Sequence, residues 1–504
     1  MRRVDSGIEI DFQGLLCYYT SDKFRPSACL RHRVEDVRCS EAFRQLLEGM
    51  LLGHLFILTG RRFSGRFCLQ DFAKYVSLNI LGMLGISCYI LADTFFVAKA
   101  LGATGLAALN LSISIYSIIQ GVGLMMGIGG ASRFGILKSQ REEQKAESVF
   151  ATSIKAGIIA GFIFTAIGLL GSGNLALILG ADASTLPLTK TYLMVILCFA
   201  PFFITNNVVL AFVRNDQNPK LSMIAMLAGS FSNIILDYVF MFPLGMGMFG
   251  AAFATGLAPI ISLAILSMHF VNKNQFAFLR KKIVWHALPD LFSLGISSFI
   301  IEVSSAVVLI TYNLVILGLE GNFGVAAYGI VANLALVVAA VFSGLAQGAQ
   351  PLFSKYYGLQ NRPMLRKIYK YALFTALLLA VVIYLGTIFS ADGIISLFNS
   401  ESHFKIAQLA KEGLLIYFFG FFFIGLNMVT AMFLSATEKP QAAFIVSILR
   451  GFVLIIPLVV ALSSFLEMTG VWLAFVFSEL ITNFASAYFG KERARTALLA
   501  QAKN

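Results

Sequence analysis

The sequence predicts an all-α integral membrane protein with twelve transmembrane helices in two six-helix lobes. Three observations predict this fold class: a low content of charge, twelve long apolar runs and a repeat that relates the two halves. Of the 504 residues, 58% are apolar and only 13% are Asp, Glu, Lys or Arg, whereas soluble domains carry about 25% charged residues. A soluble protein with so little charge could not cover its own surface. The composition therefore excludes a soluble enzyme, a disordered chain and a nucleic-acid-binding protein.

The apolar runs are each long enough to cross a bilayer, which takes about 20 mostly apolar residues. They follow one another from residue 72 onward and are separated by short polar gaps. The predicted spans cover residues 72–97, 106–131, 149–170, 191–213, 221–241, 250–271, 291–317, 328–350, 371–389, 413–434, 441–462 and 470–489.

The basic residues between the spans predict how the chain is oriented. The gaps after even-numbered spans, together with the C-terminal tail, hold 20 Lys and Arg residues, and the gaps after odd-numbered spans hold 4. Short cytoplasmic loops of membrane proteins are rich in Lys and Arg. We therefore expect the even gaps and both termini in the cytoplasm, and the protein in the plasma membrane.

The two halves resemble each other at a spacing of about 220 residues. The sequence GLAA at 105–108 matches GVAA at 324–327, and Gly250 matches Gly470. Each half holds six predicted spans, an even number, so both halves enter the membrane from the same side. They should be related by an axis along the membrane normal, with a transport site between them.

This organisation divides the chain into five parts. The first part has 11 basic and 8 acidic residues and no run long enough to span. It is a cytoplasmic extension, an interfacial segment, or a stretch that precedes the true start, for which Met50 is a candidate. The predicted parts are the extension 1–70, an N-lobe 71–271, a cytoplasmic linker 272–290, a C-lobe 291–490 and a cytoplasmic tail 491–504.

Acidic side chains inside the predicted spans are candidates for function, because an ionisable group within the bilayer is costly unless it is paired or used. Asp93 and Asp237 fall in the outer halves of spans 1 and 5, and Asn233 lies one turn before Asp237 on the same helix face. Their oxygens could hold Na⁺, or the two carboxylates could share a proton. Thr255 on span 6 could add a hydroxyl. The alternative is that local hydrogen bonds neutralise each buried carboxyl.

The second half carries Glu302 near the middle of span 7, Arg450 in span 11 and Glu479 in span 12. Arg450 lies about 16 Å into its span by helix rise, which is too deep to reach the interface comfortably. We therefore expect a structural ion pair between Arg450 and Glu479. Glu302 could take part in ion coupling, contact a substrate, or be a satisfied structural carboxyl.

Three amide side chains are candidates for contacts with a substrate or with a facing helix. Gln347 and Gln350 fall near the inner end of span 8, and Asn427 falls in span 10. Polar side chains in membranes also hold helices together, so both roles remain open for these residues.

Six short motifs give the chain a family resemblance. They are LADTFF at 91–96, GIGGAS at 127–132, NIILD at 233–237, GMGMFGAA at 245–252, AQGAQP at 346–351 and LRG at 449–451. Together they resemble the MATE family of multidrug and toxic compound extrusion transporters, in its bacterial multidrug-efflux branch. The resemblance covers about residues 65–490 and leaves the N-terminal extension outside.

The resemblance implies a secondary active antiporter that exports amphiphilic, often cationic compounds in exchange for Na⁺ or H⁺. It implies a cation site in the N-lobe at Asp93, Asn233, Asp237 and Thr255, and it ties Glu302 to coupling in the C-lobe. The second acid that usually accompanies such a C-lobe site, on span 10, is missing here. We expect no cofactor besides the coupling ion, and a monomer whose partners are small molecules and the bilayer.

Two other kinds of function fit parts of the pattern. A flippase of lipid-linked precursors from the same wider superfamily would share the fold, but its cavity should be richer in positive charge. A membrane receptor would not need duplicated halves. A membrane-embedded enzyme needs a reactive site, and the sequence has neither an HExxH metal motif nor a GxxxxGK[ST] phosphate loop. We therefore expect a transporter and not an enzyme.

Overall fold

The computed structural model describes residues 67–273, 281–398 and 403–499, and every secondary-structure element in these ranges is helical. They belong to one compact unit, residues 65–504. The predicted extension 1–70 lies almost wholly outside the described residues. Helix α8 runs to Lys273 and α9 begins at Leu288, so helix extends into both ends of the predicted linker 272–290.

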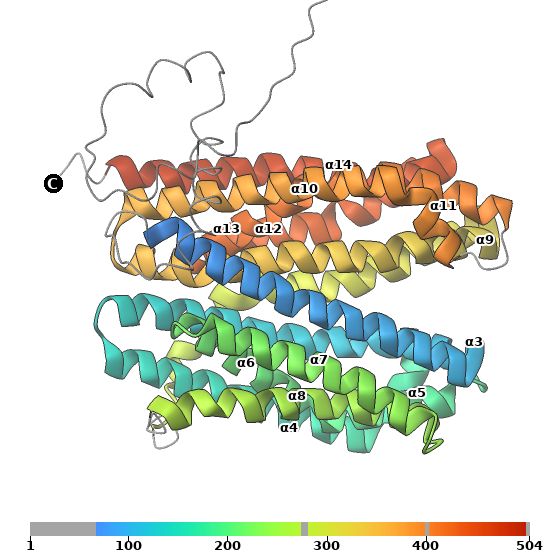
Figure 1. The fold of residues 1–504 in the computed structure, drawn as a ribbon, viewed down its shortest axis with the longest axis horizontal. Coiled ribbons are helices and arrows are strands. Elements are labelled where there is room, and N and C mark those ends of the chain that lie inside the picture. Colours follow the sequence, from blue (N-terminus) through green and yellow to red (C-terminus); the bar gives the residue numbers. More distant parts are fainter. Residues whose placement is uncertain (1–66, 274–280, 399–402, 500–504) are drawn as a thin grey trace, which may run out of the picture. The chain divides into compact units, whose positions relative to one another are not determined.

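The elements of the first half form what we call the N-lobe, and those of the second half the C-lobe. The N-lobe consists of α3 (Phe67–Ser139), α4 (Glu143–Ile178), α5 (Leu186–Cys198), α6 (Ala200–Asn215), α7 (Pro219–Met241) and α8 (Gly247–Lys273). The C-lobe consists of η4 (Trp285–Ala287), α9 (Leu288–Gly358), α10 (Arg362–Phe398), α11 (Phe404–Tyr417), η5 (Phe418–Gly420), α12 (Phe421–Ala436), α13 (Pro440–Ile448), η6 (Leu449–Val453) and α14 (Ile455–Leu499). In Figure 1 the blue-to-green helices are the N-lobe and the yellow-to-red helices are the C-lobe.

Helix α3 is two spans joined by a sharp break. Gly102 has φ 64° and ψ −155°, a conformation that glycine adopts without the steric penalty of a side chain. Tyr89, 13 residues before the break, and Tyr116, 14 residues after it, are joined by a 2.8 Å hydrogen bond between their hydroxyls. The chain therefore doubles back at Gly102.

Helix α9 and the last helices of the C-lobe double back in the same way. Gly321 in α9 has φ 60° and ψ −148°, and the rings of Tyr312 and Tyr328 stack on either side of it at 5.3 Å. In α14 the break is at Glu467, with φ 49° and ψ −132°. A Cβ on Gly470 would lie only 2.0 Å from the Leu462 carbonyl oxygen across that turn.

These breaks give the span count. Eight helical stretches are long and apolar enough to cross a membrane, or nine when the pair α5 and α6, bent by 49°, is taken as one span. Three of the nine double back, so the described residues hold twelve spans, six in each lobe. The breaks at Gly102 and Gly321 also repeat the 219-residue offset of the sequence motifs. The predicted fold class, two six-helix lobes, is confirmed.

The outer surface of the spans is apolar, as contact with lipid requires. Large hydrophobic side chains are left without protein cover on several helices, including Leu170, which is 88% exposed, and Phe389, which is 85% exposed. Exposed apolar surface on this scale marks contact with a membrane or a partner, and its spread over many helices fits a surrounding bilayer.

The lobes are packed against each other at one end, which we call the linker end because α8 ends and α9 begins there. A Cβ on Gly129 would lie 2.0 Å from the Leu291 carbonyl oxygen, and one on Gly295 would lie 1.9 Å from the Met125 carbonyl oxygen. Only glycine lets the backbones of α3 and α9 approach so closely. An ion pair between Arg133 and Glu438 also joins the lobes at this end.

The turn between α4 and α5, outside the spans, is fixed by one carboxylate. Asp182 Oδ1 accepts hydrogen bonds from the hydroxyls of Ser184 and Thr185, each 2.8 Å away, and from their backbone N–H groups at 3.0 and 2.8 Å. These donors, the Ser184 hydroxyl foremost, lower the pKa of Asp182 to about 2. The carboxylate therefore stays ionised and starts α5 much as a helix N-cap does.

Candidate functional site

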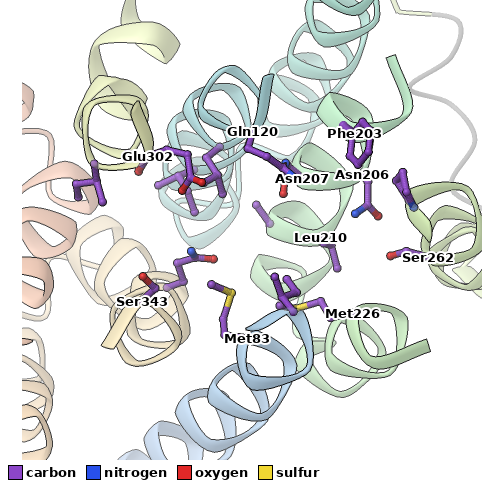
Figure 2. A pocket seen from close by; sticks show the side chains of 18 of the residues that line it. Met83, Gln120, Phe203, Asn206, Asn207, Leu210, Met226, Ser262, Glu302 and Ser343 are labelled. Atoms are coloured by element: carbon purple, nitrogen blue, oxygen red, sulfur yellow. The ribbon is translucent and has the colours of Figure 1, made fainter. Parts of the chain in front are cut away.

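A cavity lies between the lobes, on the far side of the linker-end contacts. Its N-lobe wall comes from α3, α6, α7 and α8, and its C-lobe wall comes from α9 and α12. Figure 2 shows Glu302 and Ser343 on one side of this space, and Asn206 and Leu210 on the other. Met83 and Met226 also line it, and methionine side chains adapt their shape to different apolar ligands. The cavity is therefore suited to an amphiphilic molecule.

Amide and phenol groups line part of the cavity as a hydrogen-bonded chain. The Tyr116 hydroxyl meets that of Tyr89 at 2.8 Å and accepts a hydrogen bond from Gln120 Nε2. Gln120 Oε1 in turn accepts from Asn207 Nδ2 on α6. This chain ties α3 to α6 at the level of Gln120 and Asn207, so it gives the N-lobe wall a fixed polar strip.

Glu302 lies on the cavity wall. From the sequence, three roles were open for it: ion coupling, contact with a substrate, or a structural carboxyl. Its side chain is half-buried and, among the described residues, it makes no ion pair or hydrogen bond with another side chain. A carboxylate in such a position lacks the local donors that a purely structural carboxyl needs. Its placement favours contact with a ligand in the cavity.

The four N-lobe candidates lie together and are short of donors. Asp93, Asn233, Asp237 and Thr255 are all buried, and Asn233 Nδ2 lies 3.4 Å from Thr255 Oγ1. Asp93 and Asp237 interact electrostatically. Four oxygens, Asp93 Oδ1, Asn233 Oδ1 and both carboxylate oxygens of Asp237, are buried without a hydrogen-bond donor. Buried oxygens of this kind are costly unless a cation or a proton satisfies them.

Only Thr255 of these four residues also lines the cavity. The two acids and Asn233 therefore lie behind the cavity wall, and Thr255 connects the two regions. Tyr192 on α5, which was not predicted from the sequence, is buried and interacts electrostatically with both Asp93 and Asp237. A tyrosine in an apolar span carries no signal in the sequence that distinguishes it from other core tyrosines.

The C-lobe contains a different cluster. Arg450 Nε and Nη2 each lie 2.9 Å from Glu479 Oε1, so the structure brings together the two residues expected to pair. Asn427 Nδ2 donates to Glu479 Oε2 at 2.8 Å and Asn483 Nδ2 lies 3.3 Å from Asn427 Oδ1. Arg450 is carried on the π-helical turn η6, an irregularity that is common at functional sites. Asn427 lies in this cluster and not among the residues that line the cavity.

The repeat places a different residue type in the C-lobe where the N-lobe has Asp93. Asp93 lies nine residues before the break at Gly102, and Tyr312 lies nine residues before the equivalent break at Gly321. A tyrosine therefore takes the place of the acid. The negative charge of the C-lobe cluster, on Glu479, is already neutralised by Arg450.

The two glutamines of span 8 have separate positions. Gln350 is buried, donates to Ser132 Oγ at 2.9 Å and to Ser354 Oγ at 3.0 Å, and accepts from Asn215 Nδ2 at 2.7 Å. Ser132 and Asn215 belong to the N-lobe, so Gln350 is a contact between the lobes. Gln347 lines the cavity.

Arg214 is a site residue that the sequence analysis misplaced. The fourth span was expected to end at residue 213, and Arg214 was counted among the loop residues that set orientation. In the structure it belongs to α6, is 2% exposed and lines the cavity. Its Nη1 donates to Asn79 Oδ1, and both terminal nitrogens lie 3.4 Å from Gln347 Oε1.

Comparisons with known proteins agree with this geometry. The sequence model of the MatE family matches residues 79–239 and 297–461, one stretch in each lobe. The multidrug export protein MepA of Staphylococcus saprophyticus is 26% identical over 415 residues, covering 81% of this chain and 90% of that protein. MepA of Staphylococcus aureus strain MRSA252 is 27% identical with the same coverage.

Solved structures show the same fold. An outward-facing multidrug resistance MATE family transporter of the MOP superfamily superposes with a TM-score of 0.78 at 22% identity, covering 85% of this chain and 96% of that chain. A MOP superfamily transporter from Pyrococcus furiosus, described as having a binding pocket of reverse polarity, gives a TM-score of 0.79 at 23% identity with the same coverage.

Proposed function

The chain belongs to the MatE family, and on that premise we propose that it is a secondary active antiporter of the plasma membrane. It exports amphiphilic, often cationic compounds in exchange for Na⁺ or H⁺. The names of the MepA relatives, multidrug export proteins, support the class of cargo. The apolar cavity with a carboxylate on its wall, Glu302, supports it independently.

One observation carries the antiport proposal: the four donor-less oxygens of Asp93, Asn233 and Asp237. Two carboxylates that interact electrostatically and are buried away from water cannot both remain ionised. They need Na⁺, which oxygen ligands suit, or they need at least one proton shared between them. Either ion can bind and leave as the site gains and loses access to water during the transport cycle. A coupling ion must be bound and released in this way.

The coupling follows from the shared wall between the two regions. Thr255 contacts Asn233 on one side and faces the cavity on the other. Filling the acid site therefore changes the wall that a substrate meets. A ligand shifts the balance between two lobe arrangements only by its different affinity for each, so ion and substrate act on the same equilibrium through this wall.

The closed linker end defines one of the two arrangements. With the linker in the cytoplasm, as the basic gaps predict, the structure corresponds to the outward-facing arrangement. Export then requires the contacts at Gly129, Gly295 and the Arg133–Glu438 pair to part so that cytoplasmic substrate can enter. Each chain holds the acids and the cavity complete, so a monomer suffices. The chemistry is transport without covalent change, so the protein acts as a transporter and not as an enzyme.

The proposal is tested in liposomes that contain purified protein and ethidium. Wild-type protein should drive ethidium movement under an imposed Na⁺ gradient or an imposed pH gradient, and the gradient that works identifies the ion. Asp93→Asn and Asp237→Asn should each abolish gradient-driven transport. Asp392→Asn is the matched control, because that carboxylate is exposed and pairs with Lys411. Full gradient-driven transport by both acid variants would refute the proposal.

The lipid-linked flippase is the less favoured alternative. Arg450 is neutralised by Glu479 and does not line the cavity. The cavity therefore has one arginine and one glutamate on its wall, Arg214 and Glu302, and not the excess of positive charge that a pyrophosphate needs. Assaying translocation of a lipid-linked sugar beside ethidium transport separates the two functions.

A further inference from the structure

Arg214 carries an unbalanced charge on the wall of the substrate cavity. It is 2% exposed, and its partners among the described residues are the amides of Asn79 and Gln347. The described residues include no carboxylate within ion-pair distance of it, and its Nε has no hydrogen-bond acceptor. A guanidinium buried with neutral partners alone is costly, so the free protein holds a charge that a ligand can neutralise.

The form of the guanidinium specifies the ligand group. Its planar fork matches a carboxylate, which can accept two parallel hydrogen bonds from it. The contacts to Gln347 are long, at 3.4 Å, so a carboxylate can replace them at little cost. A neutral or cationic group would leave the buried charge unmatched.

Arg214 and Glu302 lie at different depths in the same cavity. Gln120 and Asn207 are hydrogen-bonded and fix one level, and Arg214 lies seven residues farther along the continuous helix α6. Seven residues of α-helix rise about 10 Å.

The depth of Glu302 follows from α9. A Cβ on Gly121 would lie 2.9 Å from the Phe299 ring, which sets Phe299 beside the Gln120 level. Glu302 is one turn farther from the linker end than Phe299. The backbone positions of Arg214 and Glu302 are therefore separated along the cavity by about 15 Å.

We propose that Arg214 is an anion subsite, and that the cavity is built for zwitterionic amphiphiles whose cationic amine meets Glu302 and whose carboxylate meets Arg214. The proposal rests on the proposed export function for its physiological role. The binding itself depends only on the two opposite charges at different depths of one cavity. Purely cationic compounds bind through Glu302 alone and leave Arg214 with its amide partners.

The test measures binding without any gradient, so a failure of ion coupling cannot imitate its result. The probes are rhodamine 110, which carries a carboxylate, and its methyl ester rhodamine 123. Fluorescence polarisation of each dye with purified protein gives its Kd. Wild-type protein should bind rhodamine 110 more tightly than rhodamine 123. Arg214→Gln should raise the Kd of rhodamine 110 by about tenfold, as expected for loss of a charged hydrogen bond, and leave that of rhodamine 123 within about twofold.

Three further variants keep the result specific. Arg214→Lys keeps the charge without the fork and should give an intermediate Kd for rhodamine 110. Glu302→Gln should weaken binding of both dyes. Lys411→Gln removes an exposed cation that pairs with Asp392 and does not line the cavity, and it should change neither Kd. Equal weakening of both dyes by Arg214→Gln, no change in either, or the same loss in Lys411→Gln would overturn the anion subsite, whereas loss of transport alone would bear on the antiport proposal.

Discussion

The buried ion pair of the C-lobe gives the sharpest stability prediction. Arg450→Met removes the cation from a site where the Arg450 side chain is 11% exposed and that of Glu479 is 3% exposed. Two hydrogen bonds of 2.9 Å to Glu479 Oε1 are lost, and the carboxylate keeps the Asn427 side-chain amide as its donor. Leaving one partner of a buried pair alone costs about 3–5 kcal/mol.

The double variant Arg450→Met/Glu479→Gln removes both charges at once. A neutral glutamine can keep the hydrogen bond from Asn427, and the methionine fills the space left by the arginine. Replacing both partners of a buried ion pair by neutral groups is often close to neutral, so the double variant should cost about 1 kcal/mol or less. The two substitutions should therefore be strongly non-additive: the double variant should be more stable than Arg450→Met alone by at least about 2 kcal/mol.

The assay is unfolding of the detergent-solubilised protein followed by tryptophan fluorescence. Trp472 is fully buried in α14, seven residues before Glu479, and the chain has only 2 tryptophans, so the signal reports largely on this lobe. A small loss for Arg450→Met, or a double variant as unstable as the sum of the two single variants, would refute the claim that Arg450 is the resident counter-ion of Glu479.

Three further outcomes are expected elsewhere in the chain. Arg133→Glu should favour opening of the linker end by no more than about fivefold, because the pair with Glu438 is partly exposed and such pairs contribute at most about 1 kcal/mol. Labelling of single cysteines placed at that end measures the opening. The charge-swapped double variant Arg133→Glu/Glu438→Arg should reverse the effect. Gly295→Leu should open the linker end far more strongly, because even a Cβ would lie 1.9 Å from a facing carbonyl oxygen; unchanged cysteine labelling would contradict this. Asp182→Ala should speed hydrogen exchange at the start of α5, and Asp182→Asn, which keeps an acceptor oxygen but not the charge, should speed it less. Because hydrogen bonds from Ser184 and its neighbour lower the pKa of Asp182 to about 2, its contribution is complete above about pH 4 and should be lost as the pH falls through 2.

The fold was predictable because its main signals are periodic and local. Apolar runs of the right length predict spans, and the 219-residue offset between motifs reappears as the same backbone break at Gly102 and Gly321. The pairing of Arg450 with Glu479 was predictable too, because two opposite charges deep in neighbouring spans have few other ways to be neutralised. These inferences need only the order of residues and the cost of charge in lipid.

The cavity was less predictable, since its lining depends on how helices far apart in sequence meet. Arg214 follows directly on an apolar run, and an arginine there is typical of a loop that marks the cytoplasmic side. Its burial depends on Asn79 and Gln347 facing it from two other spans. Asn427 and Gln350 were equally ambiguous, because an amide in a span contacts either a ligand or a helix, and only the packing shows which.

The central claim is that an ion bound at Asp93 and Asp237 and a bound substrate act on the same equilibrium between the two lobe arrangements, so that binding of one weakens binding of the other. The most direct measurement is the ion released when substrate is added to purified protein in a weakly buffered solution, followed with a pH-sensitive dye for H⁺ and a sodium-selective dye for Na⁺. Wild-type protein should release one of the two ions in proportion to the rhodamine 123 that it binds, and Asp237→Asn should bind the dye with little or no release. Release of equal size from wild type and Asp237→Asn, or tight dye binding by wild type with no release of either ion, would contradict the account.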